Sequence, residues 1–158
     1  MAKRGARYCG AFDHTLDPKF RVTVPSRFRE VLELKGLRPR LVILPGMQAY
    51  LILVDEDEFD DIENNFESSS FASEEAADFE RFLYGMAEDA SLDSMGRLLI
   101  PERLRLYAGI DRDVTLVGVR NRIEIWDRER WKERSASAQG NFVNNAAVVF
   151  GSQQREGK

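Results

Sequence analysis

Two basic side chains and one carboxylate stand close together in the stretch TLDPKFRVTVPSRFRE, which begins at residue 15. Arg21 can bind a phosphate, or the edge of a guanine, through two parallel hydrogen bonds. Lys19 can supply a point charge to a phosphate backbone. Further basic residues that can add phosphate contacts lie just upstream, at Lys3, Arg4 and Arg7. These residue types predict a surface that binds nucleic acid.

The carboxylate of Asp17 does not fit a phosphate contact, because a negative charge beside DNA is repulsive. We expect Asp17 to shape the loop, by accepting backbone N–H groups in the turn before Pro18 or by pairing with Arg21. An ion pair with Asp17 is also the alternative to DNA contact for Arg21.

The chain repeats this arrangement. The segment SLDSMGRLLIPERLR, from residue 91, matches the first stretch at a constant spacing of 76 positions, and VTLVGVRNRIEIWDRERW matches VILPGMQAYLILVDEDEF at a spacing of 72. Two ordered matches in register indicate an internal duplication. The residues that recur in the first match are Leu16, Asp17, Arg21, Pro25, Arg27 and Arg29, as Leu92, Asp93, Arg97, Pro101, Arg103 and Arg105.

The duplication extends the roles of the first loop to the second. Asp93 is expected to shape its loop, and Arg97 is expected to contact DNA, with an ion pair to Asp93 as the alternative. For the arginines that follow each strand, DNA contact, a subunit interface and a solvated surface remain open; these are Arg27, Arg29, Arg103 and Arg105.

Each copy predicts the same order of elements. Strands are expected at 21–24 and 97–100, followed by short helices that begin near Pro25 and Pro101 and end at Gly36 and Gly109. Hairpins are then expected, with strands at 41–44 and 50–54 in the first copy and at 114–117 and 123–126 in the second. Asp55 and Asp127 are candidate N-caps of the closing helices.

A unit of about 50 residues cannot bury a large core alone, so the two copies should cover each other. We expect an α+β fold, a small β-barrel of two pseudo-symmetric units with flanking short helices. The expected organisation is a first unit at 1–66 with a basic N-terminal arm, an acidic helical connector at 67–88 capped by Ser73, a second unit at 89–134 and a tail at 135–158. The connector's aromatic residues are expected in the core.

Charge is distributed unevenly along the chain. The formal net charge is −4, yet residues 1–40 carry ten Lys and Arg against four Asp and Glu. Residues 41–93 carry one Arg against fifteen acidic residues, and residues 94–134 carry ten basic residues against seven acidic ones. Local basic patches matter for phosphate binding more than net charge does.

The remaining composition argues against several classes of function. One Cys and one His make a structural zinc site improbable, and no paired catalytic carboxylates or phosphate loop stand out. We expect no enzyme activity, metal or cofactor. No segment approaches the roughly 18 apolar residues of a membrane span, and the N-terminus lacks the apolar core of a signal peptide. The expected location is cytoplasmic.

The two copies, LDPKFRVTVPSRFRE and LDSMGRLLIPERLRLYAGI, and the segment RIEIWDRERW together resemble the MraZ family of bacterial transcriptional regulators over roughly residues 8–134. The resemblance implies tandem AbrB-like, swapped-hairpin DNA-binding units. It further implies a ring-shaped homo-oligomer that binds short repeated boxes of double-stranded DNA upstream of its own operon, in the division and cell-wall gene cluster, and associates with the nucleoid.

Two departures from the family pattern concern the loops. The family usually has Gly before the loop arginine, which the second loop keeps as Gly96 and the first replaces with Phe20. The basic residue within the loop is present as Lys19 but replaced by Met95 in the second copy. The two loops are therefore expected to be unequal.

An antitoxin-like module that also binds a partner protein is the alternative function, because AbrB-like folds serve that purpose too. Such a module normally needs a partner-binding tail. The tail here has an apolar cluster at 146–150, which could bind a partner, pack on a neighbouring subunit or be disordered.

Overall fold

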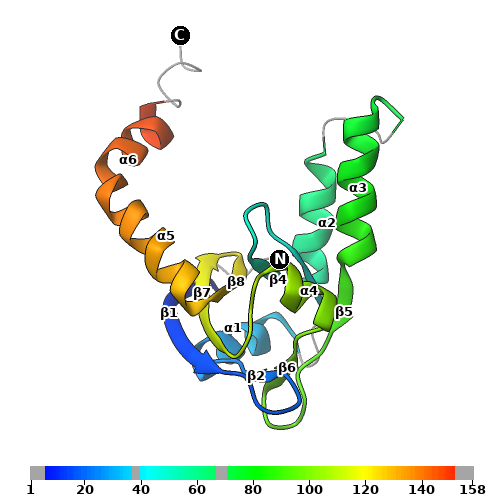
Figure 1. The fold of residues 1–158 in the computed structure, drawn as a ribbon, viewed down its shortest axis with the longest axis vertical. Helices are drawn as coiled ribbons and strands as arrows, with labels where there is room; N and C mark the ends of the chain where they lie inside the picture. Colours follow the sequence, from blue (N-terminus) through cyan, green and yellow to red (C-terminus); the bar gives the residue numbers. More distant parts are fainter. Residues whose placement is uncertain (1–5, 37–39, 67–70, 152–158) are drawn as a thin grey trace. The chain divides into compact units, whose positions relative to one another are not determined.

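The computed structural model describes residues 6–36, 40–66 and 71–151 (Figure 1). The chain divides into two compact units, Met1–Asp127 and Arg128–Lys158. Every strand of the described residues belongs to the first unit.

An antiparallel sheet of six strands forms the centre of the first unit, in the order β1-β7-β8-β4-β3-β5. Each copy of the duplication supplies one hairpin, and the two hairpins join through β4 and β8. The first strand of each copy pairs with the hairpin of the other copy, β1 with β7 and β5 with β3. The strands are β1 (Tyr8–Thr15), β3 (Leu41–Pro45), β4 (Leu51–Asp55), β5 (Glu88–Ala90), β7 (Asp113–Arg120) and β8 (Arg122–Asp127).

The expected closed barrel is not found. β1 and β5 form the two edges of the sheet, and no strand pairing joins them within the described residues. The two strands that could bridge these edges, β2 (Arg21–Thr23) and β6 (Arg97–Leu99), are only three residues long and pair with each other as a separate ribbon. The fold is therefore α+β with a mostly antiparallel sheet.

The β2–β6 ribbon relates the two copies. Val22 lies opposite Leu98, and both side chains are fully buried. Arg21 lies opposite Leu99, and Thr23 lies opposite Arg97. Because a shift of 76 positions converts Arg21 into Arg97, the ribbon places the two arginines at equivalent positions about a local pseudo-two-fold axis through the central pair.

A short helix follows each ribbon strand, as predicted. α1 (Ser26–Lys35) begins after Pro25, and α4 (Glu102–Tyr107) begins after Pro101. Both helices bury apolar side chains in the main core, which also holds the ribbon and the inner face of the sheet. Gly109 follows the C-cap of α4, and its φ of 64° lets the N–H of Ile110 reach the carbonyl of Arg105 at 3.0 Å.

Two acidic helices pack on the outer side of the first hairpin. Asp55 caps α2 (Glu56–Asn64) and Ser73 caps α3 (Glu74–Met86), as the sequence predicts. Together with β3 and β4 they form a second small core around Val42, Leu44, Val54 and Leu83. The prediction that the connector's aromatic residues lie in the core is wrong. Phe79 and Phe82 are 43% and 49% exposed because they line an open groove. Tyr84 and Phe71 are also exposed, at 43% and 97%.

The described part of the second unit consists of α5 (Arg128–Gly140) and α6 (Phe142–Gly151). Backbone hydrogen bonds continue across their junction, from Asn141 N–H to Ser137 O at 3.1 Å and from Asn145 N–H to Asn141 O at 2.8 Å. Residues 135–151 of the predicted tail are therefore helical. None of the helices in the described ranges has the length and apolar character needed to cross a membrane.

Candidate nucleic-acid interface

The two loops before β2 and β6 have the same backbone hydrogen bonds. In the first loop the N–H of Phe20 donates to Asp17 O at 2.9 Å, and the N–H of Asp17 donates to Arg21 O at 2.9 Å. In the second loop Gly96 donates to Asp93 O at 2.9 Å, and Asp93 donates to Arg97 O at 3.0 Å. The duplication is therefore kept at the level of single hydrogen bonds.

The Asp side chain organises each loop from within. Asp17 Oδ1 accepts the backbone N–H groups of Lys19 and Arg21, each at 2.9 Å. Asp93 Oδ1 accepts those of Met95 and Arg97, at 3.0 and 2.9 Å. In each loop a single carboxylate oxygen therefore holds two backbone N–H groups.

The second oxygen of each carboxylate accepts a hydrogen bond from the loop arginine. Arg21 Nε donates to Asp17 Oδ2 at 2.8 Å, and Arg97 Nε donates to Asp93 Oδ2 at 2.8 Å. Arg97 Nη1 also lies 3.8 Å from Asp17 Oδ2, so the second loop reaches the first. The intraloop ion pair, which the sequence left as an alternative to DNA contact, is present in both copies.

This hydrogen bonding lowers the pKa of both aspartates. The largest cause is the backbone N–H of Arg21 for Asp17 and that of Arg97 for Asp93, and the arginine side chains lower the pKa further. Both loops therefore hold their carboxylates charged at neutral pH.

Phe20 adopts the same left-handed backbone conformation as the glycine of the other loop. Its φ is 60°, whereas that of Gly96 is 76°. Such a conformation is uncommon for a bulky residue and is strained. The loss of Gly in the first copy has therefore not changed the course of the loop.

An arginine from the opposite copy packs on each left-handed residue. The guanidinium of Arg105 lies 3.8 Å from the centre of the Phe20 ring, and a Cβ added to Gly96 would lie 2.7 Å from Arg29 Cδ. The carbonyl groups of Phe20 and Gly96 accept the N–H groups of Ile100 and Val24 in the opposite copy, at 3.0 and 2.9 Å.

These contacts assign Arg29 and Arg105 a role that sequence reasoning missed, which is to fix each loop against the other copy. The signal in the sequence was their recurrence at the 76-residue spacing, but only the ribbon shows what they touch. Of the other two arginines, Arg103 Nη1 donates to Gly85 O at 3.2 Å, and Arg27 is exposed.

The basic groups that face solvent at this end are unequal between the copies. Lys19 is exposed, and its counterpart Met95 is 65% exposed. The side chains of Arg21 and Arg97 are 29% and 26% exposed. Within the described residues the terminal nitrogens of Arg21 have no hydrogen-bond partner, so they are available to a ligand.

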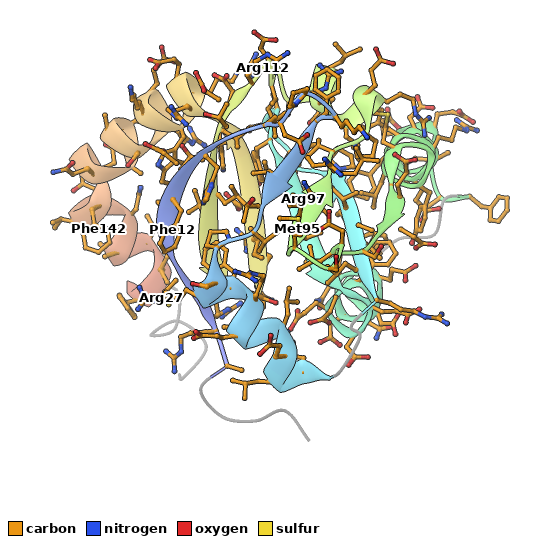
Figure 2. All side chains as sticks on the ribbon, turned by 90° about the horizontal axis from the view of Figure 1, so that it is seen from below. Phe12, Arg27, Met95, Arg97, Arg112 and Phe142 are labelled. Carbon is orange, nitrogen blue, oxygen red and sulfur yellow. The ribbon has the colours of Figure 1, made fainter. Side chains whose placement is uncertain are left out.

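Two views show where this surface lies in the first unit. Figure 1 places β2 and β6 at the end opposite the free ends of α2 and α3, and Figure 2 looks onto the ribbon end, with Arg97 and Met95 near its centre. Arg7 is exposed just before β1, and Lys3 and Arg4 lie outside the described residues. The six acidic residues of α2 therefore lie away from the loops.

Comparison with known proteins identifies the family. The model of the MraZ protein family, whose description carries the term antitoxin-like, matches residues 8–82 and again residues 83–152. The chain belongs to the MraZ family. Each match contains one of the two copies of the sequence repeat and its loop.

Individual relatives agree with the MraZ assignment over most of the chain. The transcriptional regulator MraZ of Desulforamulus reducens is 36% identical over 142 residues, which cover 90% of this chain and 96% of the relative. The regulator of the same name in Syntrophomonas wolfei is 37% identical, over 85% of this chain and 91% of the relative. That of Acetivibrio thermocellus is 34% identical, over 81% of this chain and 86% of the relative.

Proposed function

We propose that this protein is a sequence-specific DNA-binding transcriptional regulator that reads double-stranded DNA with its two ribbon loops. The observation that carries the proposal is the pair of matched loops, which present Arg21 and Arg97 at equivalent positions at the end of the unit opposite the acidic helices. The naming of its relatives as transcriptional regulators supports the proposal independently.

Each loop residue has a distinct part in the proposed contact. Asp17 and Asp93 hold the loops in shape, and they bind each arginine through Nε, which leaves its terminal nitrogens for the ligand. The two terminal nitrogens can then bind a phosphate or a guanine edge. Lys19 adds a phosphate contact in the first loop only, with Lys3, Arg4 and Arg7 as further contacts along the backbone.

Two loops of one chain offer few contacts, so the proposal includes a ring-shaped homo-oligomer. A ring repeats the loops around one face and engages several short DNA boxes at once, which converts weak contacts into useful affinity. The target would be repeated boxes upstream of the protein's own operon in the division and cell-wall gene cluster. The protein would then act in the cytoplasm, associated with the nucleoid.

An antitoxin-like module is the second candidate. The family description and the exposed apolar side chains of α6 favour it, because an antitoxin binds a partner protein as well as its promoter. Binding of promoter DNA by the isolated protein at full affinity favours the regulator, whereas binding that requires a second protein favours the antitoxin.

The dependence of DNA binding on salt tests the proposal. The chain is titrated into fluorescent DNA from directly upstream of its gene, at several salt concentrations, with scrambled DNA of equal length as the control. Released counterions give a slope of log Kobs against log salt of about −0.9 per phosphate contacted, so several loops give a steep negative slope. A flat slope, or equal affinity for scrambled DNA, contradicts the proposal.

A further inference from the structure

A second surface of the first unit is open and apolar. A groove with a volume of about 560 Å³ lies between the β3–β4 turn, α2 and α3, with Tyr107 at its base. Five aromatic side chains line it, and of these Phe79 and Phe82 are 43% and 49% exposed. Arg122 is the one charged residue among the described residues that line it. A groove of this composition fits apolar side chains rather than a polar small molecule.

The same chain carries an apolar helix of matching character. α6 has no charged residue, and its exposed side chains include Phe142, Val143 and Phe150, which are 69–78% exposed. Phe142, Ala146 and Phe150 recur at intervals of four and so lie along one stripe of the helix. Large exposed apolar surfaces of this kind mark sites of protein contact.

Charges beside the two surfaces are complementary. α2 carries six acidic residues and no basic one, and α3 carries four acidic residues against Arg81. α5, which leads into α6, carries four basic residues against two acidic ones. A basic helix followed by an apolar one therefore matches an apolar groove that is bordered by acidic helices, and their opposite net charges favour the pairing.

α5 separates α6 from the first unit along the chain. Hydrogen bonds continue through Asn141, so α5 and α6 extend as a helical segment from Asp127. At about 1.5 Å per residue, α5 carries the start of α6 roughly 20 Å from Asp127. Every copy has one groove and one α6, so a head-to-tail contact can be repeated from copy to copy and can close into a ring.

We propose that α6 of one copy docks into the groove between α2, α3 and the β3–β4 turn of a second copy. The stripe formed by Phe142, Ala146 and Phe150 covers Phe79 and Phe82, and α5 lies along the acidic helices. This contact rests on the homo-oligomer of the proposed function, which it supplies with a specific interface.

Disulfide trapping between different chains tests the contact. In a Cys9→Ser background, one tagged chain carries Phe150→Cys and a second, differently tagged chain carries Phe82→Cys. The two are mixed, oxidised and analysed on a non-reducing gel. The proposal predicts a disulfide between the two tags. It predicts none when the second chain carries Leu34→Cys, because Leu34 on α1 is similarly exposed at 53% but lies outside the groove.

Two results overturn the proposal. One is a disulfide that forms only within a single chain carrying both Phe150→Cys and Phe82→Cys, because α6 would then dock on its own copy. The other is the absence of a disulfide in both arrangements. Titration of the same samples with promoter DNA separates this proposal from the proposed function. DNA binding without cross-linking overturns only the contact between α6 and the groove. Cross-linking without DNA binding overturns only the DNA-binding function.

A second measurement uses the mass of the assembly. Phe150→Asp places a charge on the docking stripe, and we expect light scattering to show loss of the assembly with the fold intact by circular dichroism. Val148→Asp is the matched control, because Val148 is equally exposed at 72% but lies on the opposite side of α6. Equal masses for the two variants overturn the proposal.

Discussion

Gly96 and Phe20 show how a single backbone conformation constrains the two loops at the scale of residues. Both have positive φ, and both are covered by an arginine from the opposite copy. Arg29 leaves no room for a side chain at Gly96. Arg105 instead stacks on the Phe20 ring, and this cation–π contact offsets part of the backbone strain in the first loop.

Replacing Gly96 with Ala should therefore destabilise the protein. The new Cβ would lie 2.7 Å from Arg29 Cδ, and Ala disfavours a φ of 76°. We expect a loss of about 1–3 kcal/mol in the free energy of unfolding, measured by urea denaturation. Gly85→Ala is the control. A Cβ at Gly85 meets nothing within 4 Å inside helix α3, so this change should be neutral or stabilising. Equal effects would disprove the packing argument.

The aspartates give the loops a defined pH dependence. Their folded-state pKa is lowered, so their contribution to stability is present above the ordinary Asp pKa of about 3.9 and is lost as the pH falls through the lowered value. Asp17→Asn should therefore be less stable than the parent at pH 7, and the difference should shrink below about pH 4. Thermal unfolding across this range measures it, and a difference independent of pH would refute the role of charge.

Sequence reasoning reached the loop residues but not their neighbours. The mismatch between a carboxylate and DNA led us to expect Asp17 to accept backbone N–H groups, and it does so. The donors are Lys19 and Arg21, which follow Pro18 rather than precede it. The positions of Arg29 and Arg105 could not be inferred, because their contacts with Gly96 and Phe20 join residues 67 and 85 positions apart and depend on how the copies pair. The exposure of Phe79 and Phe82 could not be inferred either. An apolar stripe on a helix predicts burial, but it does not show whether another part of the chain packs on the stripe.

At the scale of elements, the β2–β6 ribbon holds both loops in place. The strands, the helices after Pro25 and Pro101, and the two hairpins follow from local patterns of apolar residues and turns, so the sequence predicts them well. The sheet order does not follow from local patterns. It depends on β1 and β5 crossing to the opposite hairpins, and the separate ribbon leaves the predicted barrel open.

Leu98→Ala tests whether the ribbon is part of the core. Leu98 is fully buried opposite Val22, so truncation should cost about 2–5 kcal/mol in the free energy of unfolding. Its neighbour Leu99, on the same strand, is 57% exposed, and Leu99→Ala should cost about 0.5 kcal/mol or less. Urea denaturation of both variants gives the comparison, and similar losses would show that the ribbon does not pack as described.

At the scale of the whole molecule, charge separates the two ends of the first unit. The ribbon loops carry Lys19, Arg21 and Arg97, whereas α2 and α3 together carry ten acidic residues, so the acidic helices would face away from bound DNA. The net charge of −4 hides this separation, and only the arrangement of the elements in space reveals which charges share a face.

The unequal loops offer a test by gain of function. Met95→Lys restores to the second loop the charge that Lys19 provides in the first. We expect tighter DNA binding and a salt slope steeper by about one unit per added contact. Phe71→Lys, which adds the same charge at an exposed site just before α3, is the control and should leave the slope unchanged. An equal gain in both variants would indicate attraction without a specific contact.

The most direct test of the account is the affinity of Arg21→Ala for the DNA upstream of its own gene. Fluorescence anisotropy should show that most binding is lost at a salt concentration where the parent binds, while light scattering shows an unchanged assembly. Arg81→Ala, which removes an equally charged side chain from α3, should bind like the parent. Unchanged affinity of Arg21→Ala would contradict the assignment of DNA binding to the ribbon loops.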